Sequence, residues 1–373
     1  MFRAGFCRRT QQPGSAAALV LLWLPAGARL RTHRLIVGTR GHAFLPERRY
    51  RRGRDAHSRL GYPPSFRPVT HLSDIGEDAL IQRLVRLVPL DPSPAAGPGD
   101  DCAVVDPGPG HSKLQLLKTD ALVEHVHFLP EAAPRAVGWK ACARVMSDFA
   151  AMGGQPERFL VTLALPPHTP VAWVENLYLG IGECLRHFGG VLAGGETSSV
   201  PPSSAAVISI AATGSVLRHH LTLRSTAKPG HALLVTGTLG GSRHAKHLTF
   251  SPRLREAAWL VSHFKPAAMM DLSDGLARDL PRLAAASGCG FVVEPSALPL
   301  TAGCTVEQAL GDGEDFEMLL ALEDARVDEL LAAWCDVFPE LALTRIGRLV
   351  EAGAGETLAG GWEHFAPGLG IKH

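Results

Sequence analysis

The stretch that decides the fold is MDLSDGL, residues 270–276. It places two carboxylates, a hydroxyl and a glycine between an apolar run typical of a strand and a segment typical of a helix. Alone, such a stretch could simply be a helix N-terminus with its capping residues. Whether it has a functional meaning depends on how many similar clusters the chain contains.

Five further acidic clusters lie beside apolar segments. They are Gly99-Asp100-Asp101, Thr119-Asp120, Ser147-Asp148, Gly194-Gly195-Glu196-Thr197 and Gly313-Glu314-Asp315-Phe316-Glu317. Most of them can be explained singly as an acidic turn, a local cap or a glycine turn. The pair at 147–148 is harder to explain, because aspartate is a poor helix-interior residue and its neighbours are apolar. Six clusters together favour one shared role, the binding of divalent cations such as Mg²⁺, which take oxygen ligands.

Several common nucleotide-binding and catalytic motifs are missing. The chain has no G-x-x-x-x-G-K-[ST], no kinase catalytic-loop set, no G-x-S-x-G and no G-x-G-x-x-G in a βαβ unit. A bound nucleotide is therefore expected to be held mainly through metal ions. The pair His125-x-His127 lacks a third zinc ligand at a suitable spacing, so we interpret it as structural or substrate-contacting. Trp362-x-His364 is either core packing or an aromatic lid for a flat ring.

Charge is distributed unevenly along the chain. Residues 1–70 contain fourteen arginines and only Glu47 and Asp55 as acids, so this segment carries +12. The whole chain carries +1, which leaves −11 for the remainder. So acidic a body argues against nucleic-acid binding, which depends on Lys and Arg to neutralise phosphates.

The cysteine pattern and hydropathy limit the class of protein further. Seven widely spaced cysteines without a C-x-x-C pair predict reduced thiols in a cytoplasmic enzyme, not a disulfide framework or a zinc site. No apolar run reaches the roughly 18 residues that span a membrane. We therefore expect no membrane partner.

Periodicity predicts a two-domain chain of α+β or α/β class. Helices are expected from Ser73 or Asp74 to Val88 and over 137–152, 171–188, 253–264, 279–287 and 328–338. Strands are expected over 114–118, 159–165, 205–215, 232–236, 268–271, 291–293, 316–322 and 344–349. The predicted divisions are an Arg-rich extension over 1–69, an N-terminal mixed α/β domain over 70–218 and a C-terminal α/β domain over 219–373.

Eight motifs, taken together, resemble the thiamine-monophosphate kinase family, which belongs to the superfamily of aminoimidazole ribonucleotide synthetase. They are GDDCAVV (99–105), KTDALVEHVHF (118–128), MSDFAAMGG (146–154), LAGGETS (192–198), LTLRSTAKPG (221–230), MDLSDGL (270–276), GEDFEMLL (313–320) and GWEHF (361–365). The match runs in order from about residue 73 to 366.

This resemblance implies ATP- and Mg²⁺-dependent phosphorylation of thiamine monophosphate to thiamine diphosphate. It also implies a homodimer whose N-terminal sheets pair into a barrel. Residues at matching positions imply several Mg²⁺ ions held by Asp101, Thr119, Asp120, Asp148, Glu196, Asp271 and Asp274. They likewise imply ATP contacts from Gly195, Glu196, Arg224 and Ser273, and thiamine contacts from His127, Glu314 and Trp362.

Four positions depart from the family pattern. Lys118 stands where a Ser or Thr is usual, which either removes a metal contact or replaces it with a fixed positive charge. Glu196 replaces an Asp, while His231 and Asp312 alter turns. One alternative is another enzyme of the superfamily: a selenophosphate synthetase, a hydrogenase-maturation protein or a purine-synthesis enzyme. The other is a catalytically silent binding protein.

Residues 1–69 differ from the rest of the chain. The run AAALVLLWLPA (16–26) resembles a short signal peptide, and the remaining arginine-rich part resembles a transit segment. Export would separate an ATP-using enzyme from its co-substrate. We therefore also consider a disordered extension, or an upstream stretch translated from a start placed too early.

Overall fold

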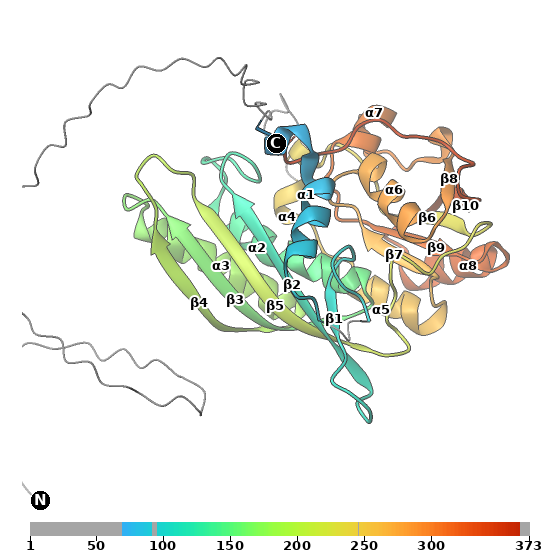
Figure 1. The fold of residues 1–373 in the computed structure, drawn as a ribbon, viewed down its shortest axis with the longest axis horizontal. Helices are drawn as coiled ribbons and strands as arrows, with labels where there is room; N and C mark the ends of the chain where they lie inside the picture. Colours follow the sequence, from blue (N-terminus) through green and yellow to red (C-terminus); the bar gives the residue numbers. More distant parts are fainter. Residues whose placement is uncertain (1–68, 92–94, 245, 366–373) are drawn as a thin grey trace, which may run out of the picture. The chain divides into compact units, whose positions relative to one another are not determined.

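The computed structural model describes residues 69–91, 95–244 and 246–365. The predicted disordered extension lies outside the described residues, apart from Val69. The described chain is built on two five-stranded sheets with helices packed against them (Figure 1). This confirms a two-domain chain with α and β elements.

The first half contains one sheet and three α-helices. Its elements are α1 (Gly76–Leu84), β1 (Ala103–Val105), β2 (Lys113–Val123), α2 (Pro134–Ala151), β3 (Gln155–Leu165), α3 (Val171–Phe188), β4 (Val191–Ser199) and β5 (Val207–Leu217). The strand order is β1-β2-β5-β3-β4, with β3 and β4 parallel and the other pairs antiparallel. Residues alternate between buried and more exposed along β5, so one face of the sheet packs on the core.

The second half contains the other sheet. Its elements are β6 (Ala232–Thr236), α4 (Lys246–Thr249), α5 (Leu254–His263), β7 (Ala268–Asp271), α6 (Leu276–Ala286), β8 (Gly290–Val293), α7 (Val306–Gly311), β9 (Met318–Leu322), α8 (Val327–Val337) and β10 (Leu343–Val350). The strand order is β7-β9-β6-β10-β8, and every pair is antiparallel. Short 3₁₀ turns occupy Leu72–Asp74, Val85–Leu87, Ser242–His244, Pro295–Ala297 and Asp324–Arg326.

Alternation along β6 explains how the second sheet is covered. Leu233 and Val235 face a core that includes α6, whereas Ala232 and Leu234 join the larger core that includes α2, α5 and α8. The three strands β6, β7 and β9 are buried at every residue. Both faces of the sheet are therefore covered, and one continuous core joins the two halves.

Helix α2 lies at the centre of the described chain. Fourteen of its 18 residues are buried, because it packs on the first sheet, on α3 and on β7, α4 and α5 of the second half. A helix that is buried on nearly all sides normally lacks charge. Lys140, Arg144 and Asp148 are nevertheless buried on α2, so their partners must come from the elements around it.

Several sequence-based boundaries were wrong. α1 begins at Gly76 with Ile75 as its N-cap, not at Ser73 or Asp74. α6 begins at Leu276, three residues before the expected start at 279, and Pro281 is an interior residue of the helix. The glycine cluster at 194–195 belongs to strand β4, whose nine exposed residues show no apolar alternation to predict it. β1, α4 and α7 were not predicted because each is short.

No α-helix among the described residues is both long enough and apolar enough to cross a bilayer.

The crossing of α2 and α3 depends on two glycines. A Cβ on Gly180 of α3 would lie 1.8 Å from the Arg135 carbonyl oxygen, and one on Gly138 of α2 would lie 2.0 Å from the Leu177 carbonyl oxygen. The helices are thus in direct backbone contact there. Bulkier residues would force them apart.

We predict that Gly180→Ala lowers the free energy of unfolding by about 1–3 kcal/mol, the typical cost of overpacking. Denaturant unfolding of the full chain measures it. Gly182→Ala, two residues along the same helix, is the control, because its Cβ would meet only the flexible Arg186 side chain. This variant should gain up to about 1 kcal/mol from helix propensity. Equal losses in both variants would contradict the close-approach explanation.

Candidate functional site

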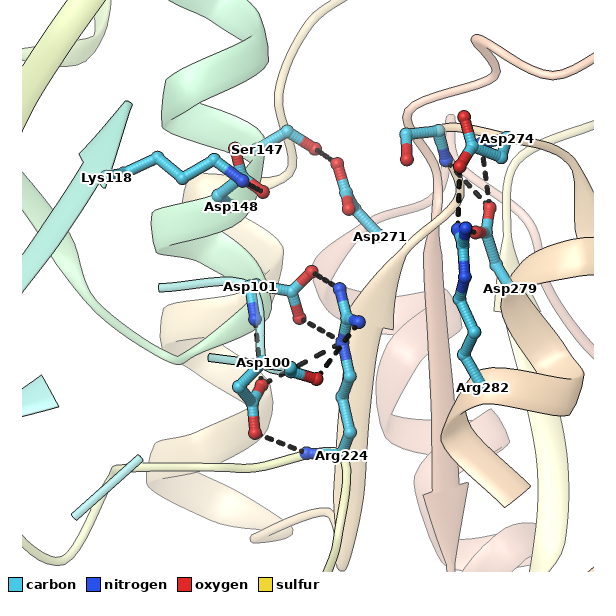
Figure 2. A network of polar contacts seen from close by, with 12 residues as sticks. Asp100, Asp101, Lys118, Ser147, Asp148, Arg224, Asp271, Asp274, Asp279 and Arg282 are labelled. Atoms are coloured by element: carbon cyan, nitrogen blue, oxygen red, sulfur yellow. Dashed lines mark hydrogen bonds and ion pairs between the residues drawn. The ribbon is translucent and has the colours of Figure 1, made fainter. Parts of the chain in front are cut away.

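The loop after β7 is shaped by hydrogen bonds from its own helix. Asp279 of α6 accepts hydrogen bonds from the backbone N–H groups of Ser273 and Asp274 at 3.0 and 2.9 Å (Figure 2). Gly275 adopts φ of 97°, and a Cβ there would lie 2.8 Å from the Leu310 carbonyl oxygen, so only glycine fits. The loop therefore holds Asp271, at the end of β7, in a fixed position.

Asp101, Asp148 and Asp271 form a buried carboxylate triad. One oxygen from each lies within 4.8 Å of the others, although the residues come from the turn before β1, from α2 and from β7. Three hard oxygen donors at this separation suit a divalent cation such as Mg²⁺ or Mn²⁺. Four of the six clusters found in the sequence lie in or beside this site. The cluster at 313–317 adjoins the loop after β7, where the Glu314 N–H donates to the Ser273 carbonyl oxygen at 2.9 Å, and the cluster at 194–197 lies on β4.

Each triad carboxylate has a partner (Figure 2). Lys118 Nζ lies 2.6 Å from Asp148 Oδ1, and Arg224 donates from Nη2 to Asp101 at 2.5 Å. The hydroxyl of Ser147 donates to Asp271 at 2.6 Å. Arg224 is itself fixed by Asp100, which accepts a hydrogen bond from the Arg224 backbone N–H at 3.2 Å.

The electrostatics of the triad favour an added cation. Burial, together with the nearby Asp101 carboxylate, raises the pKa of Asp271 to about 6. Burial also raises the pKa of Asp148. Lys118 lowers this pKa, whereas the charges of Asp271 and Asp101 raise it further. Crowded buried carboxylates resist ionisation unless positive charge is supplied, and a metal ion supplies it.

Two cations connect the triad to a cavity of about 1000 Å³. Lys118 and Arg224 line this cavity as well as contacting the triad, and Arg278 and Arg282 line it from α6. Burial works against the charge of Lys118, but Asp148 and Asp120 outweigh burial and raise its pKa, so it stays protonated. Five carboxylates line the same cavity, those of Glu77, Asp78, Asp100, Asp274 and Glu356. The four cations are suited to contact a polyphosphate, whose remaining charge a bound metal ion would offset.

Helix α1 forms one wall of the same cavity. Ile81 of α1 and Val85 just after it contribute apolar surface, and Asp78 of α1 lies 3.2 Å from Arg282 and 3.5 Å from Arg278. Phe291 and Leu358 supply further apolar surface. The cavity thus combines an apolar wall, suitable for a flat ring, with a cationic part, suitable for phosphates.

A second polar cluster is fully buried beside α2. Lys140 Nζ lies 2.7 Å from Glu314 Oε2, 2.7 Å from His247 Nδ1 and 2.6 Å from the His127 carbonyl oxygen. Lys140 and Glu314 have no exposed side-chain surface. The lysine joins two residues that the resemblance assigns to thiamine binding.

Trp362, the third residue assigned to thiamine binding, is connected to His127 through the ring of His364. The rings of His127 and His364 have centroids 5.7 Å apart, and His364 meets Trp362 edge to face at 5.9 Å. The Trp362 backbone N–H donates to the Asp274 carbonyl oxygen at 2.9 Å. His127, Glu314 and Trp362 are therefore brought into one neighbourhood, adjoining the loop after β7.

The remaining predicted site residues are placed differently. Asp120 pairs with Arg144 of α2 at 3.0 Å, and Asp274 pairs with Arg282 at 2.6 Å. Thr119 is exposed, and because side chains alternate along β2 it faces away from α2. Gly195 and Glu196 lie on the exposed strand β4, three strand spacings from β2, or about 14 Å.

Sequence reasoning missed several residues that hold the site together. They are Lys140 and Arg144 on α2 and Arg278, Asp279 and Arg282 on α6. The signal for the first two was present, since positions 140, 144 and 148 recur at one helical spacing within an apolar segment. No comparable periodicity marks the others.

Comparison with known proteins gives two domain matches. Residues 99–216 match the family model described as AIR synthase related protein, N-terminal domain. Residues 228–359 match AIR synthase related protein, C-terminal domain. The two matches include all three triad carboxylates.

Individual relatives agree with these matches. A thiamine-monophosphate kinase of Synechococcus elongatus is 33% identical over 70% of this chain and 86% of its own length. A thiamine-monophosphate kinase of Rhodopirellula baltica is 36% identical over 69% of this chain and 84% of its own length. The solved structure of AaThiL complexed with AMPPCP and TMP is 30% identical, covers 80% of this chain and 100% of its own, and superimposes with a TM-score of 0.69.

We predict that Asp271→Asn weakens Mn²⁺ binding at least about tenfold, since changing even the outer partners of metal ligands costs about 10–100-fold. Asn removes the charge but keeps an oxygen for the Ser147 hydroxyl, so the fold should survive. Electron paramagnetic resonance of free Mn²⁺ measures the affinity. Asp324→Asn, at an exposed aspartate paired with Arg345, is the control. Unchanged affinity in Asp271→Asn would remove this residue from the metal site.

Proposed function

Because this chain belongs to the thiamine-monophosphate kinase family, we propose that it transfers the γ-phosphoryl group of ATP to thiamine monophosphate, yielding thiamine diphosphate and ADP. The observation that carries the proposal is the carboxylate triad, whose partners Lys118 and Arg224 also line a cavity of about 1000 Å³. AMPPCP, the nucleotide in the related complex, is a non-hydrolysable analogue of ATP. We place the reaction in the cytoplasm, where ATP is supplied.

The chemistry requires little from the protein beyond positioning and charge. A phosphate oxygen of thiamine monophosphate forms a bond to the γ phosphorus as the bond to the β–γ bridging oxygen breaks, and ADP leaves. The acceptor phosphate is largely ionised near neutrality, because its second pKa is about 6. No strong general base and no covalent enzyme intermediate are needed. The main barrier is bringing two anions together.

Asp101, Asp148 and Asp271 are the residues that would hold Mg²⁺. A metal ion held by these carboxylates would supply positive charge that offsets the negative charge developing during transfer. The burial of these three carboxylates keeps competing water away and strengthens each electrostatic contact. Asp120, Asp274, Thr119 and Glu196 remain proposed ligands from the resemblance, and the first two are paired with arginines in this chain.

Arginines around the cavity are suited to hold the nucleotide phosphates. Arg224 offers a rigid fork of donors and is kept in place by Asp100 and Asp101. Arg278 and Arg282 extend the positive surface along α6. Ser273 lies between the triad residue Asp271 and Asp274, where its hydroxyl is suited to contact the phosphates.

His127, Glu314 and Trp362 are proposed to bind the thiamine part. The Trp362 ring is suited to stack on the cationic thiazolium or on the pyrimidine. Glu314 supports the site through Lys140, which also fixes the backbone at His127. Breaking a buried pair of this kind by removing one partner typically costs about 3–5 kcal/mol.

The proposal includes a homodimer in which the N-terminal sheets pair into a barrel. Strand β4 is an edge strand of the first sheet within the described chain, and all nine of its residues are exposed. Exposed edges invite pairing with another chain. Such pairing would cover Gly195 and Glu196 and bring them toward the partner subunit, which fits their distance from the triad here.

We predict that the full chain, incubated with Mg²⁺, ATP and thiamine monophosphate, forms thiamine diphosphate and ADP in equal amounts. Chromatography measures both products. Omitting either substrate, or chelating the metal, should abolish thiamine diphosphate formation. Binding of both substrates without product would instead favour a catalytically silent binding protein.

We further predict that Trp362→Leu raises KM for thiamine monophosphate about tenfold, the value of roughly 1.4 kcal/mol of lost stacking. KM for ATP should change little, because the Trp362 ring contacts His364, which in turn contacts His127, and Trp362 is not among the residues that line the cavity. Trp362→Phe keeps an aromatic face and should recover part of the loss. Steady-state kinetics with each substrate varied separately gives both constants. Equal effects on the two constants would contradict the assignment.

A further inference from the structure

Lys118 places a fixed positive charge beside the carboxylate triad, in contact with Asp148. Its side chain reaches from β2 toward α2, and Nζ lies 2.6 Å from Asp148 Oδ1 (Figure 2). The side chain is 23% exposed and also lines the cavity. A lysine ammonium usually lies in water, so the placement of this one against a buried carboxylate requires a physical explanation.

The carboxylates on the β2 side of the site are each matched by a cation. Asp148 pairs with Lys118, and Asp120 pairs with Arg144 at 3.0 Å. No net negative charge is left on that side for a metal ion. Two carboxylates that would otherwise suit a divalent ion are neutralised by the chain itself.

The opposite side of the triad is less completely matched. Asp101 pairs with Arg224, whereas the partner of Asp271 is the neutral hydroxyl of Ser147. Arg224 is shared with Asp100, so four carboxylates, the triad and Asp100, face two cations, Lys118 and Arg224. The unmatched negative charge lies with Asp101 and Asp271, which is where a divalent ion is favoured.

An ammonium and a divalent ion also compete directly. A divalent ion bound at Asp148 Oδ1 would lie within a few ångströms of Nζ, where like charges repel strongly in a buried site. Removing the ammonium would free this oxygen and restore one negative charge to the triad.

We propose that Lys118 takes the place of a divalent ion at Asp148, so that the triad of this chain holds a single metal ion, centred on Asp101 and Asp271. The inference deepens the proposed function, because it concerns the charge available to the same phosphates. One of the charges that neutralise the phosphates is then built into the fold instead of being drawn from solution.

The experiment counts metal ions on the full chain with Mn²⁺ alone, by electron paramagnetic resonance of free Mn²⁺ and by equilibrium dialysis. The unaltered chain should bind one tight ion. Lys118→Met, of similar length and neutral, should bind two. Lys118→Arg, which keeps the charge, should still bind one. Lys113→Met, at an exposed lysine on the same strand, is the matched control and should also bind one.

Two tight ions on the unaltered chain would overturn the inference, whether or not any variant folds. The same conclusion follows if Lys118→Met folds, as judged by its melting transition, and still binds one ion. Lys118→Thr provides a second neutral variant, since a β-branched residue suits a strand. The count does not depend on catalysis. A chain with one ion and no kinase activity would refute only the proposed function, and an active chain with two ions would refute only this inference.

Discussion

The structure depends on one constraint, the need to pair every buried charge on α2. Lys140, Arg144 and Asp148 occupy successive turns of a helix that has almost no solvent contact. Their partners come from both halves of the chain, from β2 for Asp148 and Arg144 and from the segment before β9 for Lys140. Because an unpaired buried charge is costly, the two sheets must close on α2 in one register. Polar pairing, more than apolar burial, fixes the site at this seam.

The same constraint explains why the triad comes from three separate segments. Asp148 is held by α2, Asp271 by the end of β7, and Asp101 by a turn that Arg224 fixes from the start of the second half. No two of these segments are adjacent in the sequence, so the triad forms only when both halves are folded together. A site built in this way couples metal binding to the stability of the whole described chain.

How far the sequence could predict this arrangement differed between elements. The long periodic helix α3 was predicted to the residue. The structure brings the carboxylates at 101, 148 and 271 together, and their shared role in metal binding stays a prediction. Strand β4 was missed because glycine-rich, exposed edge residues show no alternation. The partners of the triad could not be predicted, since ion pairs such as Asp148 with Lys118 join residues thirty positions apart and depend on register. The local sequence pattern predicts whether a segment is a helix or a strand, whereas ion pairs between elements depend on the tertiary structure.

Charge placement suits the site to a reaction between two anions. The chain past residue 70 is acidic overall, yet Lys118, Arg224, Arg278 and Arg282 gather around one cavity. Each is held by a carboxylate, so each cation is fixed in position before any ligand arrives. Preorganised charge avoids the reorganisation that water would require when charge develops during transfer. The carboxylates therefore have two roles, as candidate metal ligands and as supports that keep the cations directed at the phosphates.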